Sequence, residues 1–163
     1  RPPIYTLFPY TTLFRSIREA ARNSGMDERI RFSGFVTDDD LLQLYNAADL
    51  FVFPSFYEGF GLPLLESMAC GRAVTCSGLS AMPEVADGAA LLFDPSSPDE
   101  IVRAMADLLL DAELRARMER LGLQRAAAFS WARTAAATLA IYREVASGAA
   151  PARQYSSVQV SGS

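Results

Sequence analysis

The chain has 163 residues, of which 50% are hydrophobic and 21% are charged, and its formal net charge at pH 7 is -4. This length and composition suit one globular domain with a sizeable core, and a negative chain gives no indication of a nucleic-acid partner. The sequence contains no histidine, so the commonest general base and metal ligand is missing. Its two cysteines, Cys70 and Cys76, lie in apolar surroundings, which favours buried, reduced thiols over a metal or redox pair.

The first 16 residues differ in origin, we expect, from the rest. Residues 6–16 match, without a gap, one reading frame of a widely used short-read sequencing adapter, and residues 1–5 resemble pieces of its upstream part with frame slips. We therefore interpret residues 1–16 as an assembly artefact, not native sequence, and exclude them from fold reasoning. The alternative is an unusual aromatic N-terminal strand. On the first interpretation the natural gene is interrupted at about Ile17.

Strands and helices alternate along the remaining chain. We expect short buried strands at residues 29–33, 50–54, 73–77 and 90–94, and helices at residues 17–24, 41–47, 63–70, 97–110 and 111–129. A short helix begins at Pro83, and Ser130 caps a terminal helix for which Trp131 is the expected anchor. The alternation predicts an α/β fold, with a parallel sheet covered by helices on both faces. The small polar residues 148–163 predict a disordered tail.

Two acidic positions allow a structural and a ligand-binding interpretation. Thr37-Asp38-Asp39-Asp40 suggests a metal site, but the acids also suit the positive end of a helix dipole with Thr37 as the cap, and we favour the cap. Glu84 follows Pro83 at a helix start. It can contact a ligand or serve only the helix, and we favour the structural role.

The segment Glu58-Gly59-Phe60-Gly61-Leu62-Pro63-Leu64-Leu65-Glu66 offers two carboxylates on either side of a glycine turn. It follows the strand expected at residues 50–54, and its proline opens the next helix, where a missing N–H costs nothing. A strand, a glycine turn and a helix start direct backbone N–H groups and the helix dipole at an anionic ligand. The glutamates suit neutral hydroxyls instead, since an ionised carboxylate accepts two hydrogen bonds from a vicinal diol. The segment thus predicts a site for phosphate, ribose and sugar hydroxyls together.

The same segment resembles the donor-binding signature of the retaining GT-B glycosyltransferases, and in particular family 4 of nucleotide-sugar-dependent hexosyltransferases. The resemblance extends over about residues 17–145, with further matches in the right order at residues 31–36, 46–55, 66–71, 82–85 and 129–131. It implies that residues 17–147 form a partial Rossmann-like, nucleotide-sugar-binding domain, the C-terminal half of a GT-B fold.

The resemblance also implies roles for individual residues. Glu58 is the catalytic residue and contacts sugar hydroxyls near the reacting carbon, while Glu66 holds the ribose hydroxyls. Backbone N–H groups in the glycine turn face the diphosphate, and the backbone after the strand at residues 29–33 borders the base. The residues that this assigns to substrate binding are Val36, Gly59, Phe60, Gly61, Leu62 and Glu66.

The implied reaction transfers a hexosyl group from a nucleoside diphosphate sugar with retention of configuration. The leaving phosphate assists a front-face displacement, so no dedicated protein base, metal or cofactor is needed. This agrees with a chain that lacks histidine. The acceptor, a saccharide, lipid or small molecule, would bind in the other domain. A cytoplasmic enzyme fits, including one that associates peripherally with a membrane.

Two other functions stay open, a non-catalytic nucleotide-sugar-binding module and a GT-B nucleotide-sugar epimerase. A phosphorylase needs a lysine for its pyridoxal cofactor, and the chain has no lysine. If the strand order is 3-2-1-4-5-6, the two interior strands before residue 17 are missing. We then expect residues 29–33 to lose their link to the strand at residues 50–54, and we expect the 163-residue chain to be poorly stable and inactive alone.

Overall fold

A computed structural model of the chain describes residues 4–6 and 12–148. Its main body contains a parallel sheet in the order β3-β4-β5, formed by β3 (Phe51–Phe53), β4 (Val74–Ser77) and β5 (Leu91–Phe93). Phe51 lies opposite Val74, and Thr75 lies opposite Leu91. The α/β fold with a parallel sheet is confirmed.

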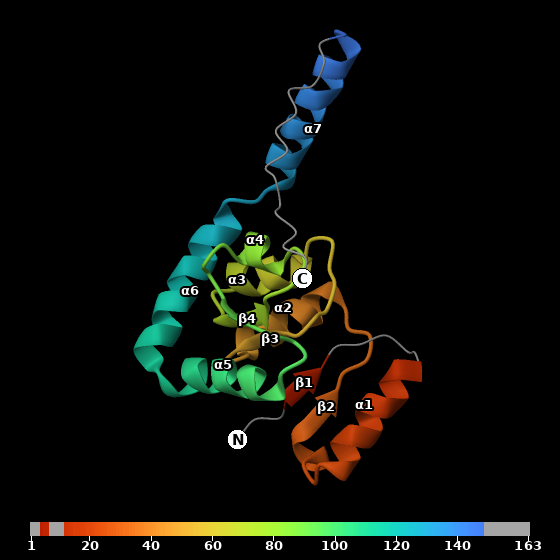
Figure 1. The fold of residues 1–163 in the computed structure, drawn as a ribbon, viewed down its shortest axis with the longest axis vertical. Coiled ribbons are helices and arrows are strands. Elements are labelled where there is room, and N and C mark those ends of the chain that lie inside the picture. The colour runs from red at the N-terminus through yellow and green to blue at the C-terminus, as the bar shows by residue number, and fades with distance from the viewer. Residues whose placement is uncertain (1–3, 7–11, 149–163) are drawn as a thin grey trace, which may run out of the picture.

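Helices cover both faces of this sheet (Figure 1). They are α2 (Asp38–Ala47), α3 (Leu62–Ala69), α4 (Met82–Ala86), α5 (Pro98–Leu110) and α6 (Ala112–Ala127). Val74 and Cys76 belong to a core cluster with residues of α3 and α4. A second cluster holds Ala73 with Leu108 of α5 and Met118 of α6. Because successive strand residues face opposite sides, the two clusters lie on the two faces of β4.

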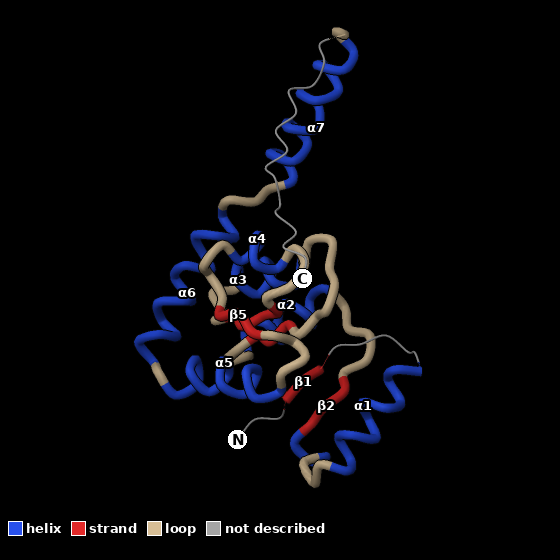
Figure 2. The backbone as a smooth tube through the Cα atoms, in the orientation of Figure 1, coloured by secondary structure: helices blue, strands red, loops and turns tan. Residues whose placement is uncertain are grey.

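A smaller unit precedes the main body, and Figure 2 shows its two strands apart from the other three. Strand β2 (Ile30–Phe32) pairs in parallel with β1 (Ile4–Thr6), beside helix α1 (Thr12–Asn23) and the 3-10 turn η1 (Asp27–Arg29). Among the described residues, β2 and β3 share no sheet, as expected if no strand links them. Helix α1 begins earlier than the helix expected at residues 17–24, and the origin of residues 1–16 stays a prediction.

The helix ends follow the sequence closely. Thr37 accepts a hydrogen bond from the N–H of Asp40 at 3.2 Å, so the interpretation of this acidic run as a capped helix start is confirmed. Ser97 and Ser130 likewise cap α5 and α7 (Trp131–Ala146). Gly25 has φ +70°, a left-handed conformation that glycine adopts without strain after a helix.

The terminal helix α7 differs from expectation. It extends away from the main body (Figure 1) and contains no buried residue. The prediction that Trp131 anchors this helix is wrong for the described chain, because 78% of the side chain is exposed. Within the described residues, the indole belongs to neither core cluster. The expected tail at residues 148–163 lies outside the described residues from residue 149 onward.

Candidate functional site

The candidate site is the loop between β3 and α3, at the carboxyl end of β3. Gly61 is buried, has φ +91° and ψ +56°, and is the N-cap of α3. Pro63 lies in the first turn of that helix, as predicted. This left-handed conformation lets the chain turn sharply from the loop into α3. Glycine adopts it readily, whereas a residue with an L side chain would be strained there.

Glu58 is held at its backbone and at its side chain. Ser80, in the loop between β4 and α4, donates from its hydroxyl to the carbonyl of Glu58 at 2.7 Å, and the N–H of Glu58 donates to the same hydroxyl oxygen at 3.3 Å. Ser55 donates to carboxylate oxygen Oε1 of Glu58 at 2.9 Å. Two strand-end loops are therefore joined at this residue, which fits the rule that carboxyl ends of parallel strands meet at one edge.

Glu66 lies on α3 with an exposed side chain. Its oxygen Oε2 accepts a hydrogen bond from the hydroxyl of Tyr45 at 3.1 Å. Tyr45 comes from α2 and is buried, with 5% of its surface exposed. Burial first, and then the charge and the hydrogen bond of Glu66, raise the pKa of Tyr45 far above its ordinary value. The phenol therefore remains the donor of this bond at any ordinary pH.

Backbone N–H groups in the loop are available to a ligand. Among the described residues, no hydrogen bond gives an acceptor to the N–H of Gly59, Phe60, Gly61 or Leu62, whereas Leu64 N–H already donates to the carbonyl of Gly61 at 3.0 Å. These unused donors lie at the positive end of the α3 dipole, an arrangement that attracts anions. The two carboxylates flank them in the sequence.

A small hollow of about 150 Å³ adjoins the loop at Gly59 and Phe60 and is bounded by α4 and the end of α6. The Phe60 ring packs edge-to-face on Phe129, with centroids 5.7 Å apart. Glu84 lines this hollow, and its backbone carbonyl accepts from Arg125 at 2.7 Å. Arg125 also donates to the carbonyl of Val85 at 2.8 Å and forms a salt bridge with Asp87 at 3.2 Å. Its side chain therefore binds carbonyls in the last turn of α4.

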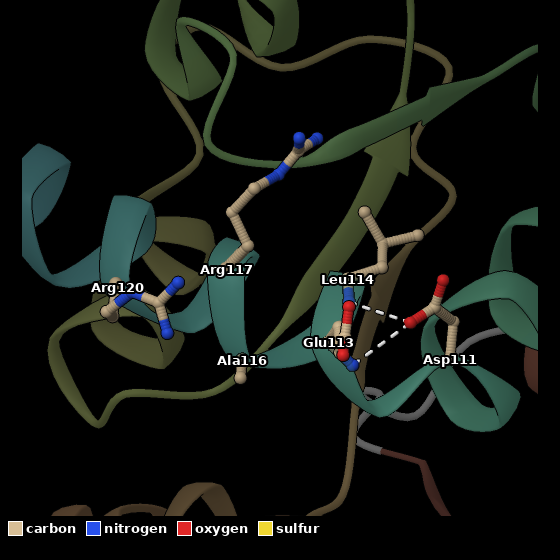
Figure 3. A pocket seen from close by; sticks show the side chains of 6 residues that line it. All are labelled: Asp111, Glu113, Leu114, Ala116, Arg117 and Arg120. Carbon is tan, nitrogen blue, oxygen red and sulfur yellow. Dashed lines mark hydrogen bonds between the residues drawn. The ribbon is translucent and has the colours of Figure 1, made fainter.

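A second, larger depression lies elsewhere, at the start of α6 (Figure 3). It measures about 560 Å³ and shares no residue with the loop. Asp111 accepts hydrogen bonds there from the N–H groups of Glu113 and Leu114, at 3.0 and 2.9 Å. This is an ordinary helix cap, and the geometry gives it no chemistry beyond that.

The segment that was expected to border the base does not share this sheet edge. Gly34 and Val36 follow β2, which belongs to the other sheet. The structure therefore does not place the backbone after β2 at the same sheet edge as Glu58. The assignment of Val36 to donor binding stays a prediction.

Three polar residues that hold the site were missed in the sequence: Tyr45, Ser55 and Ser80. Tyr45 and Glu66 are 21 positions apart, and Ser80 and Glu58 are 22 apart, so local spacing gives no signal of either contact. In the turn after β4, the Ser77 hydroxyl accepts from the N–H of Leu79 at 3.1 Å, and it is Ser80 that contacts Glu58.

Within residues 16–148, whose side chains the structure describes, no cluster of three or more histidine, cysteine, aspartate or glutamate side chains could hold a metal ion. Neither is any described helix both long and apolar enough to cross a membrane. Cys70 and Cys76 are free thiols, as predicted, although only Cys76 is fully buried.

This chain is similar in sequence to known glycosyltransferases. The profile of the family described as glycosyl transferases group 1 matches residues 12–125. An Escherichia coli protein named O-antigen chain mannosyltransferase B is 45% identical over 114 residues, which are 70% of this chain and 30% of that protein.

Solved structures of other proteins are similar to this chain in fold. Sucrose-phosphate synthase from Thermosynechococcus elongatus matches with a TM-score of 0.79 at 25% identity, over 88% of this chain and 38% of the other. Anabaena HepE in complex with UDP-glucose matches with a TM-score of 0.69 at 20% identity, over 76% of this chain and 35% of the other.

The parallel sheet and its flanking helices thus define a GT-B type glycosyltransferase domain. The chain belongs to the glycosyl transferases group 1 family. It spans about 30% of the length of the Escherichia coli mannosyltransferase to which it is similar. The resemblance inferred from the sequence is confirmed for the GT-B fold and for membership of a glycosyltransferase family; the retaining mechanism stays a prediction.

Proposed function

We propose that this chain supplies the donor-binding part of an enzyme that transfers a hexosyl group from a nucleoside diphosphate sugar to an acceptor, with retention of configuration. The observation that carries the proposal is the set of unused N–H donors at residues 59–62, between two carboxylates that are each held by a hydrogen bond. The UDP-glucose bound by Anabaena HepE, which has the same fold, supports a donor of this chemical class.

Each part of the loop has a distinct proposed task. The N–H groups bind the diphosphate and stabilise the charge that develops as it leaves. Glu58 accepts hydrogen bonds from sugar hydroxyls near the reacting carbon, and Ser55 fixes the carboxylate that does so. Glu66 accepts from the ribose hydroxyls. The leaving phosphate assists a front-face displacement, so the protein needs no base, metal or cofactor of its own for this step.

The proposed roles of Glu58 and Glu66 can be distinguished experimentally, because in this proposal only Glu58 contacts the transferred sugar. The protein for this test is the full-length enzyme that we propose, in which the described domain is joined to an acceptor-binding domain. Calorimetry with a panel of nucleoside diphosphate hexoses, and with the matching nucleoside diphosphates, identifies the donor. We expect Glu58→Ala to weaken the sugar-bearing ligand only, by about tenfold, and Glu66→Ala to weaken both ligands to a similar degree.

The control is Glu119→Ala, on α6 and away from the loop, which should leave both affinities unchanged. Equal loss for both ligands in Glu58→Ala would contradict its assignment to the sugar. If no nucleoside diphosphate binds to the wild-type enzyme, the proposed function is wrong. The 163-residue chain alone is expected to show no sugar transfer, and detectable transfer by it would contradict the two-domain proposal.

A further inference from the structure

Tyr45 has a contact that the proposed reaction does not use directly. Its hydroxyl reaches the Glu66 carboxylate from a buried position on α2, at 3.1 Å. Its ring packs edge-to-face on Phe51 of β3, with centroids 5.5 Å apart, and Phe51 stacks on Phe53 at 5.9 Å. The phenol is thus fixed to the sheet by aromatic packing, whereas the carboxylate that it holds is exposed to solvent.

An exposed glutamate normally samples several rotamers, and binding then has to immobilise the side chain. A hydrogen bond from a rigid donor removes part of that cost before the ligand arrives. Among the described residues, Tyr45 makes the only side-chain hydrogen bond to the Glu66 carboxylate, and it uses Oε2. A carboxylate offers about four acceptor positions, so positions on both oxygens remain for two neighbouring hydroxyls.

We propose that Tyr45 is a positioning residue of the donor site, whose hydroxyl holds the Glu66 carboxylate in the orientation that accepts the two ribose hydroxyls. The inference rests on the proposed function. It predicts a specific kind of defect, because Tyr45 acts through Glu66 and has no part in binding the base, the diphosphate or the sugar. Loss of the hydroxyl should weaken ligands that carry ribose hydroxyls and spare ligands that lack them.

Tyr45→Phe tests this, since it keeps the ring on Phe51 and removes only the oxygen. The ligands are the ribonucleoside diphosphate that binds best to the wild-type two-domain enzyme and its 2′,3′-dideoxy analogue. We expect Tyr45→Phe to weaken the ribonucleotide about tenfold and to change the affinity for the dideoxy analogue by less than about twofold. In a Glu66→Ala background, Tyr45→Phe should have no further effect on either ligand.

The control is Thr75→Val, which removes another buried hydroxyl, one that donates to the carbonyl of Leu91 at 2.9 Å. It should lower stability without changing the preference for ribose. Should Tyr45→Phe fold poorly, Tyr45→Met fills the same site without a hydroxyl and gives the same comparison.

Three outcomes would overturn the inference. Unchanged ribonucleotide affinity in Tyr45→Phe would show that Glu66 does not need the bond, while wild-type binding would leave the proposed function intact. Equal weakening of both ligands would reveal a general structural role for Tyr45. A wild-type enzyme that binds neither nucleotide would refute the proposed function and this inference with it.

Discussion

Gly61 allows the sharpest test of how the loop is built. A Cβ at this position would overlap the terminal methyl group of Met82, lie 3.1 Å from its sulfur and come within 3.5 Å of the Phe53 ring. These Met82 atoms are the far end of a flexible side chain, but the residue is completely buried, so the side chain has to repack within the core to admit the methyl group. The backbone itself, at φ +91°, is strained for any L side chain.

These two effects set the expected size of the change. The left-handed backbone costs roughly 1 kcal/mol for alanine, and forcing an extra methyl group into a packed core costs about 1–3 kcal/mol. Gly61→Ala should therefore lower the free energy of unfolding by about 2–4 kcal/mol, a large part of the stability of an ordinary domain. With a urea m-value of about 2 kcal/mol per molar, the midpoint would fall by about 1–2 M.

Gly59→Ala is the matched control, because a Cβ there would meet nothing within 4 Å and the residue has no positive φ. Urea unfolding of both variants, followed by circular dichroism, gives the comparison. A midpoint for Gly61→Ala within error of Gly59→Ala would show that Met82 repacks freely. The fit between the β3–α3 loop and α4 would then not be what determines the turn.

Two further predictions concern residues around the same edge and in the core. Ser80 adopts a left-handed φ of +57° while it bonds Glu58, so Ser80→Ala should lower the free energy of unfolding by about 1–2 kcal/mol. Ser80→Gly should be about 1 kcal/mol less harmful because it relieves the backbone; equal losses in urea unfolding would contradict that strain. Burial raises the pKa of Cys76 from its ordinary 9.0 to about 12. The unfolded chain therefore loses the thiol proton at a lower pH than the folded chain. The free energy of unfolding should be unaffected by Cys76 below pH 9 and should fall as the pH rises above it, by at most about 1.4 kcal/mol per pH unit. Cys76→Ala should show a smaller fall over the same pH range.

The sequence predicted the main sheet well because its signals are local. A few adjacent residues are enough to predict the buried strand at residues 73–77, the helix caps Thr37 and Ser97, and the turn at Gly61. The site was predicted only in part for the same reason. Its carboxylates and N–H donors lie within nine adjacent residues, whereas the residues that hold the Glu66 carboxylate and the Glu58 backbone come from α2 and from the β4–α4 loop.

The contrast between Glu66 and Trp131 shows which parts of the domain this chain determines by itself. Glu66 and Glu58 are positioned by α2, the end of β3 and the β4–α4 loop. Phe51, Phe53 and Met82, which support those segments, all belong to one core cluster or pack against it. None of these contacts depends on the separate β1–β2 sheet. The proposed donor half-site therefore has its own packing and hydrogen bonds, whereas the exposed Trp131 on α7 obtains neither from the described chain.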